Sequence, residues 1–185
     1  MPLSYLLGMF PTAHLVGTIV GHDPTREGSG NPGASNVYRV AGARAGAFVL
    51  GGDVLKGLLP AAVGLLLDGR PLGLAAGVAA VVGHVLPATR LGRGGKGVAT
   101  FGGMSLGLFP LVSLVVLLLW GVLMRLFRTP SIGSIGLVLA VPVGVAIRGR
   151  PWWEIAATAG ASLLVVLRHR TNIRLLLRGE ERSIR

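Results

Sequence analysis

Long apolar stretches alternate with short polar ones along nearly the whole chain. A helix of about 20 apolar residues crosses the hydrocarbon core of a bilayer, which is roughly 30 Å thick. Six stretches are long enough or nearly so, and a seventh, residues 97–109, is short and rich in glycine. Its length alone leaves open whether it crosses. The six lie near residues 3–21, 45–67, 71–88, 110–124, 131–147 and 152–167.

The positive charges decide whether 97–109 crosses. If it does, fourteen Lys and Arg residues fall on one side of the membrane, and only Arg70, Arg148 and Arg150 fall on the other. Without that crossing the division is eight against nine. Basic residues concentrate in cytoplasmic loops, so the sequence predicts seven spans, an outside N-terminus and a cytoplasmic C-terminus. Loop 22–44, loop 89–97 and the tail from residue 168 then share the cytoplasmic face.

The composition agrees with an all-α integral membrane protein that forms a single domain over residues 1–185. Apolar residues make up 51% of the chain and charged residues 14%, whereas about a quarter of a soluble domain is charged. The absence of cysteine excludes disulfides and thiolate chemistry. The net charge of +11 fits loops facing anionic lipid, and no aromatic–basic interleaving indicates nucleic acid.

The first polar stretch, GSGNPGASNVYR at residues 28–39, holds a dense group of polar side chains. Its start fits the GxGxxG pattern, but no strand–helix–strand unit accompanies it. Glycines still let backbone N–H groups converge on an anion, and an arginine adds a fixed charge. The alternative is a plain surface loop with Gly and Asn as turn residues. The candidate residues are Gly28, Ser29, Gly30, Asn31, Gly33, Ser35, Asn36 and Arg39.

The second polar stretch, residues 83–100, surrounds Lys96 with glycines just before an apolar helix. A helix N-terminus favours a bound anion because its free N–H groups and macrodipole point there. The stretch lacks P-loop spacing, since Gly97 follows Lys96. The alternative is a basic loop that anchors lipid headgroups. The candidates are His84, Gly94, Gly95, Lys96, Gly97 and Thr100.

The third polar stretch begins RHRTNIR at residue 168. His169 and Asn172 are three residues apart, so both can face one side of a helix. The alternative is a basic amphipathic helix lying at the membrane interface. Within the second span, Asp53 and Lys56 have the spacing of an ion pair, which either braces the bundle or serves a site. No His, Asp and Glu set has metal-ligand spacing, so neither a metal nor a cofactor is expected.

In this order, GSGNPGASNVYR, GGKGVAT and RHRTNI resemble the three motifs of the bacterial acyl-phosphate:glycerol-3-phosphate acyltransferases, the PlsY family. GGDVLKG and GHVLP extend the resemblance along the chain. It implies transfer of an acyl group from acyl phosphate to the 1-hydroxyl of glycerol 3-phosphate, which yields lysophosphatidic acid and inorganic phosphate. The catalytic residues that it implies are Ser29, Arg39, Lys96, His169 and Asn172.

The resemblance also implies a multi-pass protein of the bacterial inner membrane, with an upstream acyl-phosphate synthase as a functional partner. Acyl phosphate is already activated, so positioning and charge neutralisation can supply most of the acceleration. We expect direct attack by the glycerol hydroxyl, with a substrate phosphate taking the proton. The rival is general-base catalysis by His84 or His169. A transporter of a phosphorylated metabolite is the alternative class, although its site should lie near the membrane midplane.

Overall fold

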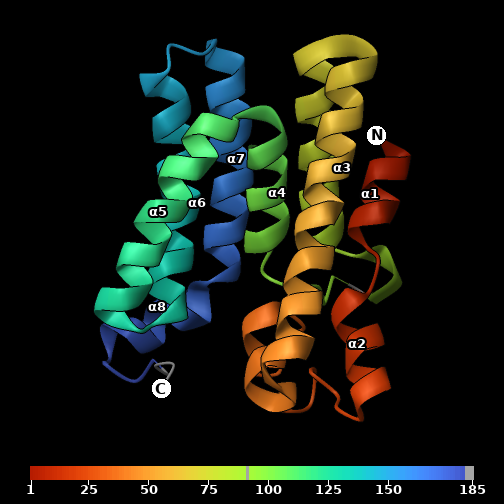
Figure 1. Cartoon of the computed structure of the whole chain (residues 1–185), viewed down its shortest axis with the longest axis vertical. Helices are drawn as coiled ribbons and strands as arrows, with labels where there is room; N and C mark the ends of the chain where they lie inside the picture. The colour runs from red at the N-terminus through yellow and green to blue at the C-terminus, as the bar shows by residue number, and fades with distance from the viewer. Residues whose placement is uncertain (91, 182–185) are drawn as a thin grey trace.

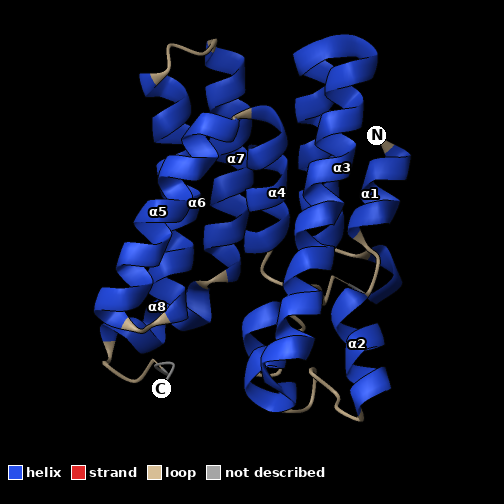
Figure 2. Cartoon of the chain, in the orientation of Figure 1, coloured by secondary structure: helices blue, strands red, loops and turns tan. Residues whose placement is uncertain are grey.

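The computed structural model describes residues 1–90 and 92–181, and all regular structure within them is helical (Figure 2). Two arginines of the predicted tail, Arg182 and Arg185, lie outside the described residues. The elements are α1 (Pro2–Gly8), α2 (Thr12–Val20), α3 (Ala34–Val85), the 3-10 helix η1 (Ala88–Arg90), α4 (Val98–Leu108), α5 (Pro110–Phe127), α6 (Pro130–Ile147), α7 (Trp152–Arg168) and α8 (Arg170–Leu177).

The 52-residue α3 is three helical segments rather than one rod. Non-helical backbone at Gly42 ends a short first segment, and a second break at Asp68 and Gly69 reverses the chain. Figure 1 shows this reversal at the top of α3. The two long segments touch at glycines: a Cβ built on Gly64 would lie 2.8 Å from the Cα of Gly73. The hairpin therefore depends on residues without side chains at its contact.

Two predicted boundaries are wrong. Residues 34–41 were expected in a polar loop but are helical, since the first segment of α3 begins at Ala34 and the chain bends only at Gly42. The apolar stretch 3–21 is two helices instead of one. Pro11 lies at that break, where its missing N–H and its ring prevent a continuous helix.

Four helical stretches are long and apolar enough to cross a membrane, namely Pro2–Val20, Ala34–Arg90, Pro110–Phe127 and Pro130–Ile147. Large apolar side chains face outward along them, including Leu66, Leu118 and Ile147, which are 84%, 74% and 80% exposed. Such a surface is incompatible with water but suits lipid. The chain is accordingly a multi-pass membrane protein.

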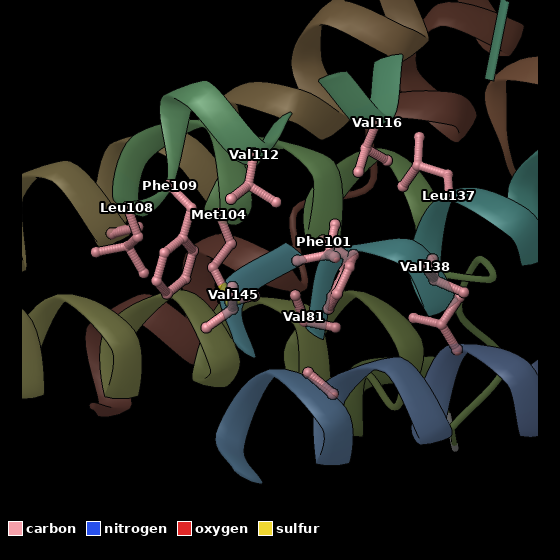
Figure 3. Packing of buried hydrophobic residues seen from close by; sticks show 14 of the residues in the cluster. Val81, Phe101, Met104, Leu108, Phe109, Val112, Val116, Leu137, Val138 and Val145 are labelled. Atoms are coloured by element: carbon pink, nitrogen blue, oxygen red, sulfur yellow. The ribbon is translucent and has the colours of Figure 1, made fainter. Parts of the chain in front are cut away.

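The 11-residue α4 lies at the centre of the bundle, between α3 and the group α5, α6 and α7 (Figure 1). Its Phe101 and Met104 are fully buried and pack among Val81, Val138 and Val145 (Figure 3). On the opposite side α4 meets α3 through small residues. A Cβ on Gly103 would come within 2.0 Å of the Val54 carbonyl oxygen, so only glycine permits this approach.

The connections divide between the two ends of the bundle. In Figure 1 the reversal within α3, the α4–α5 junction and the loop between α6 and α7 lie at the upper end. The loop between α2 and α3, the α5–α6 junction and α8 lie at the lower end. The stretches expected to carry chemistry are thus gathered at or toward the lower end.

A buried carboxylate holds the upper end together. Glu154 at the start of α7 is 1% exposed, and Arg70 of α3 contacts it at 2.6 and 2.8 Å. Arg150 contacts it at 2.9 Å, and Arg70 also donates to the carbonyl of Leu108 at the end of α4. The sequence indicated Arg70 and Arg150 only as outer charges. The structure makes them partners of one glutamate that joins three helices.

We predict that Glu154→Gln destabilises the protein, because it leaves two arginines facing a neutral buried group. Because both arginines are about one third exposed, the expected cost is that of losing charged hydrogen bonds, about 1.5–3 kcal/mol, and about 1 kcal/mol shifts Tm by roughly 2–4 °C at this chain length. Thermal unfolding in detergent should therefore show a Tm at least about 3 °C lower. Asp68→Asn, an exposed position at the same end, is the matched control, and equal shifts in both variants would contradict the prediction.

Candidate active site

A cavity of about 300 Å³ brings the three polar stretches together. Its wall includes residues from the loop after α2, from the loop before α4 and from the junction of α7 with α8. Tertiary structure therefore unites motifs that are far apart in the chain. The predicted residues that line it are Ser29, Asn31, Gly33, Ser35, Asn36, Arg39, His84, Lys96, Gly97, His169 and Asn172.

Asn36 organises the first loop. Its Oδ1 accepts a hydrogen bond from the Ser29 backbone N–H at 2.8 Å, and its Nδ2 donates to the carbonyls of Pro24 and Glu27 at 2.9 and 3.0 Å. The side chain is 1% exposed. Gly28 has a φ of +63°, and a Cβ there would lie 2.3 Å from Asn36 Oδ1. Asn36 thus shapes the loop that carries Ser29, and Gly28 is needed for close approach.

The glycines around Lys96 fit the loop against α3. A Cβ on Gly94 would lie 2.0 Å from the His84 carbonyl oxygen, and one on Gly95 would lie 2.2 Å from His84 Nε2. Gly97, with a φ of +89°, is the N-cap residue of α4. Gly94 and Gly95 are therefore placed behind Lys96. They do not line the cavity, and neither do Gly28, Gly30 and Thr100.

Thr100 is fully buried. Among the described residues its Oγ1 has no hydrogen-bond partner. Its carbonyl faces Gly57 of α3, where a Cβ would come within 1.9 Å of that oxygen. The structure therefore places Thr100 in the contact between α3 and α4, where its backbone makes a close packing contact.

His169 and Asn172 present different groups to the cavity. His169 is 2% exposed, and its Nδ1 donates to the Val165 carbonyl at 2.8 Å, since a carbonyl can only accept. Burial lowers the pKa of His169, which favours a neutral ring with a lone pair on Nε2. Asn172 Oδ1 accepts from Lys96 Nζ at 2.5 Å. The third motif thus offers one neutral imidazole and one amide that holds the lysine.

The cavity is built for negative charge. Burial lowers the pKa of Lys96, Glu181 opposes this effect, and Arg39 and Arg168 add to it as neighbouring positive charges. The N-terminal residues of α3 and α4 line the same wall, and so does His169, which precedes α8. Helix N-termini carry partial positive charge and free N–H groups. Together these groups would stabilise a phosphate where no single one would suffice.

The rest of the cavity wall is mostly apolar. It is formed by residues of α3, α4, α5 and α6 that line the same cavity as the polar groups. A hydrocarbon chain can be buried there while a charged head remains beside Lys96. The main apolar lining residues are Leu106, Val116, Leu117, Trp120, Leu137 and Val141.

Asp53 and Lys56 form the predicted ion pair, with Nζ and Oδ1 2.6 Å apart, and both are buried. Asp53 also lies 3.8 Å from His84 Nδ1, and these two residues line the cavity. Asp53 is therefore part of the cavity wall, and its partner Lys56 is not. Sequence spacing indicated the pair but not its contact with His84.

Two residues near Lys96 were not among the candidate site residues that the sequence indicated. Arg168 donates from Nη2 to the Gly94 carbonyl at 3.0 Å and so ties the second loop to α7. Glu181 lines the cavity and accepts hydrogen bonds from Asn172 Nδ2 and Ser131 Oγ at 2.7 and 2.6 Å. The sequence feature that could have indicated Glu181 is Gly179. A glycine just after a helix often reverses the chain, so the residues that follow it can turn back toward the helix.

Known proteins are similar to this chain in sequence and in fold. The profile of the glycerol-3-phosphate acyltransferase family matches residues 1–179. A glycerol-3-phosphate acyltransferase of Rubrobacter xylanophilus is 42% identical over 182 residues, 98% of this chain and 92% of the relative. One of Pseudomonas fluorescens is 42% identical over 188 residues, 97% of this chain and 95% of the relative.

The crystal structure of PlsY (YgiH), an integral membrane glycerol 3-phosphate acyltransferase, in its glycerol 3-phosphate form superposes with a TM-score of 0.96 at 32% identity. The superposition covers 100% of this chain and 93% of that one. The same protein in its lysophosphatidic acid form gives a TM-score of 0.92. The chain therefore belongs to the glycerol-3-phosphate acyltransferase family of the PlsY type.

Proposed function

We propose that this glycerol-3-phosphate acyltransferase takes its acyl group from acyl phosphate and releases lysophosphatidic acid and inorganic phosphate. One observation carries the proposal: a single cavity joins a cationic polar end to an apolar remainder. The polar end suits a water-soluble phosphate ester, and the apolar part suits an acyl chain. The two reactants would then meet where the linings change from polar to apolar.

The transfer is a direct displacement at the acyl carbonyl. The 1-hydroxyl oxygen of glycerol 3-phosphate bonds to the carbonyl carbon, and the bond from that carbon to the phosphate oxygen breaks. The hydroxyl proton passes to a phosphate oxygen of a substrate. Because phosphate is a good leaving group, the protein supplies position and charge rather than a nucleophile.

Lys96 and Arg39 are proposed to offset the repulsion between two phosphate-bearing substrates. Arg39 Nε donates to the Ser35 carbonyl at 3.2 Å, which directs this exposed arginine along the first segment of α3. Ser29 contributes its hydroxyl at the cavity wall. Asn31 and Ser35 line the same wall and complete the phosphate pocket. His169 is positioned to accept a hydrogen bond at Nε2.

General-base catalysis is the rival mechanism. His169 is the better placed of the two histidines, because its Nδ1 is committed to Val165 and its ring is neutral. His84 faces Asp53 on one side and Gly95 on the other. A covalent acyl-Ser29 intermediate is disfavoured because no base lies beside Ser29 in the sequence.

We infer seven membrane crossings with the N-terminus outside and the site facing the cytoplasm. The division of basic residues, fourteen against three, favours this orientation, and the grouping of loops at the two ends agrees with the number of crossings (Figure 1). The broken helix α1–α2 would count as one crossing and α3 as two. The proposed location is the bacterial inner membrane, where an acyl-phosphate synthase would supply the donor.

Purified protein in detergent should release inorganic phosphate when given acyl phosphate and glycerol 3-phosphate together. We expect one lysophosphatidic acid molecule for each phosphate released. Acyl-CoA should not replace acyl phosphate in the same assay. Acylation of glycerol 3-phosphate with acyl-CoA as the sole donor would refute the proposed donor but not the acceptor. Uptake of phosphate into vesicles without acylation would instead favour a transporter.

Lys96→Met should lower kcat/KM by about 10²–10³, the usual effect of losing one electrostatic stabiliser of a transition state. The measurement is phosphate release at saturating and limiting acyl phosphate. Arg93→Met removes an equal charge from an exposed position in the same loop and should change the rate little. Similar losses in both variants would mean that bulk charge, and not the Lys96 contact, controls the reaction.

The pH dependence of kcat/KM separates the two mechanisms. Burial lowers the pKa of His169, so its ring is neutral at pH 7 and becomes protonated only as the pH falls. In the substrate-assisted route the acidic limb belongs to substrate phosphate, so His169→Gln should retain that limb and lose less than about a hundredfold in rate. His22→Gln, away from the cavity wall, is the control. Loss of the limb with a roughly thousandfold decrease would establish His169 as the base.

A further inference from the structure

The end of α8 returns the chain toward the cavity. The Gly179 N–H donates to the Leu176 carbonyl, and the Glu180 N–H donates to the Leu175 carbonyl at 2.9 Å. This pair of hydrogen bonds, with Gly179 at a φ of +69°, is a Schellman motif, which ends a helix and reverses the backbone. Glu181 follows immediately. Its position in the cavity wall is thus a consequence of local helix capping.

The Glu181 carboxylate occupies a place suited to a substrate anion. Its Oε1 accepts from Ser131 Oγ at 2.6 Å and from Asn172 Nδ2 at 2.7 Å. Asn172 in turn holds Lys96 Nζ through its Oδ1. The negative charge therefore lies one side chain away from the lysine and raises its pKa against the effect of burial.

Among residues 1–90 and 92–181, nothing bonds the second carboxylate oxygen of Glu181. Glu181 Oε2 is buried and makes no hydrogen bond to any part of the chain that the structure describes. A buried unpaired carboxylate oxygen is costly. The contact is accordingly incomplete, and Glu181 can leave it more easily than a fully bonded group could.

We propose that Glu181 is a tethered competitor of the phosphate-bearing substrates and must leave the cavity before they bind. A phosphate bound by Asn172 and Lys96 would lie beside the Glu181 carboxylate, which bonds the same Asn172, and the two anions would repel each other strongly. A group on a short tether has an effective concentration on the order of millimolar, enough to compete with a metabolite. Glu181 lies beyond residues 1–179, which match the family profile. The inference rests on the proposed phosphate site.

The competition has a measurable size. A tail that fills the site about nine-tenths of the time raises the apparent dissociation constant of the anion about tenfold. Glu181→Ala should therefore tighten binding of inorganic phosphate by up to about tenfold, and Glu181→Gln, which keeps the shape but loses the charge, by a smaller factor. Glu180→Gln removes the neighbouring exposed carboxylate and should leave the affinity unchanged.

The test is calorimetric titration of the full-length protein with inorganic phosphate, followed by KM for glycerol 3-phosphate. Tighter phosphate binding and a lower KM in both Glu181 variants, but not in Glu180→Gln, would support competition. Unchanged or weaker binding in Glu181→Ala would overturn it. A lower kcat with an unchanged KM would also overturn it, because Glu181 would then be positioning Asn172.

Phosphate binding separates this inference from the proposed donor. If acyl phosphate is not turned over but phosphate still binds more tightly to Glu181→Ala than to the unaltered protein, the competition stands and the donor is wrong. If turnover occurs and the affinity is the same in all variants, the donor stands and the competition is refuted.

Discussion

The structure depends on enclosing positive charge within an apolar bundle. Lys96 is partly buried, with Arg39 and Arg168 as nearby positive charges, and the N-termini of α3 and α4 face the same cavity. Such a site is costly to leave without a negative partner. In the structure Asn172 accepts a hydrogen bond from Lys96, and Glu181 supplies the negative charge. In the proposed reaction it comes from phosphate, so the same electrostatic demand explains substrate binding and competition by the tail.

Close helix packing makes this site possible. Lys96 lies just before the N-terminus of the short α4. This helix reaches the centre of the bundle only because glycines line its contact with α3. A Cβ at Gly57 or Gly103 would collide with backbone oxygen atoms on the facing helix. Substitutions there would push α4 away and displace the N-terminus that lines the cavity. Packing and binding are therefore coupled through α4.

Much of the fold could be predicted because a long stretch of apolar residues indicates a membrane-spanning helix. The helical class and the ion pair of Asp53 with Lys56 are confirmed. The boundaries were less predictable. Residues 34–41 carry Ser, Asn and Arg, which suit a loop, but they form a helix that Gly42 ends. Within this helix Arg39 is exposed, whereas Asn36 is buried and bonded to the preceding loop.

The sequence by itself determined the apolar helices, the uneven charge and the three motifs, since each depends on residues close together in the chain. Tertiary structure decided which motif residues share a wall. It set Gly94, Gly95 and Thr100 behind the cavity and brought Asn172 to Lys96 across 76 positions. It also brought in Glu181, which no motif contained. Contacts of this kind depend on how the helices pack and on the direction that the chain takes after a capped helix. The residue pattern within one segment predicts neither.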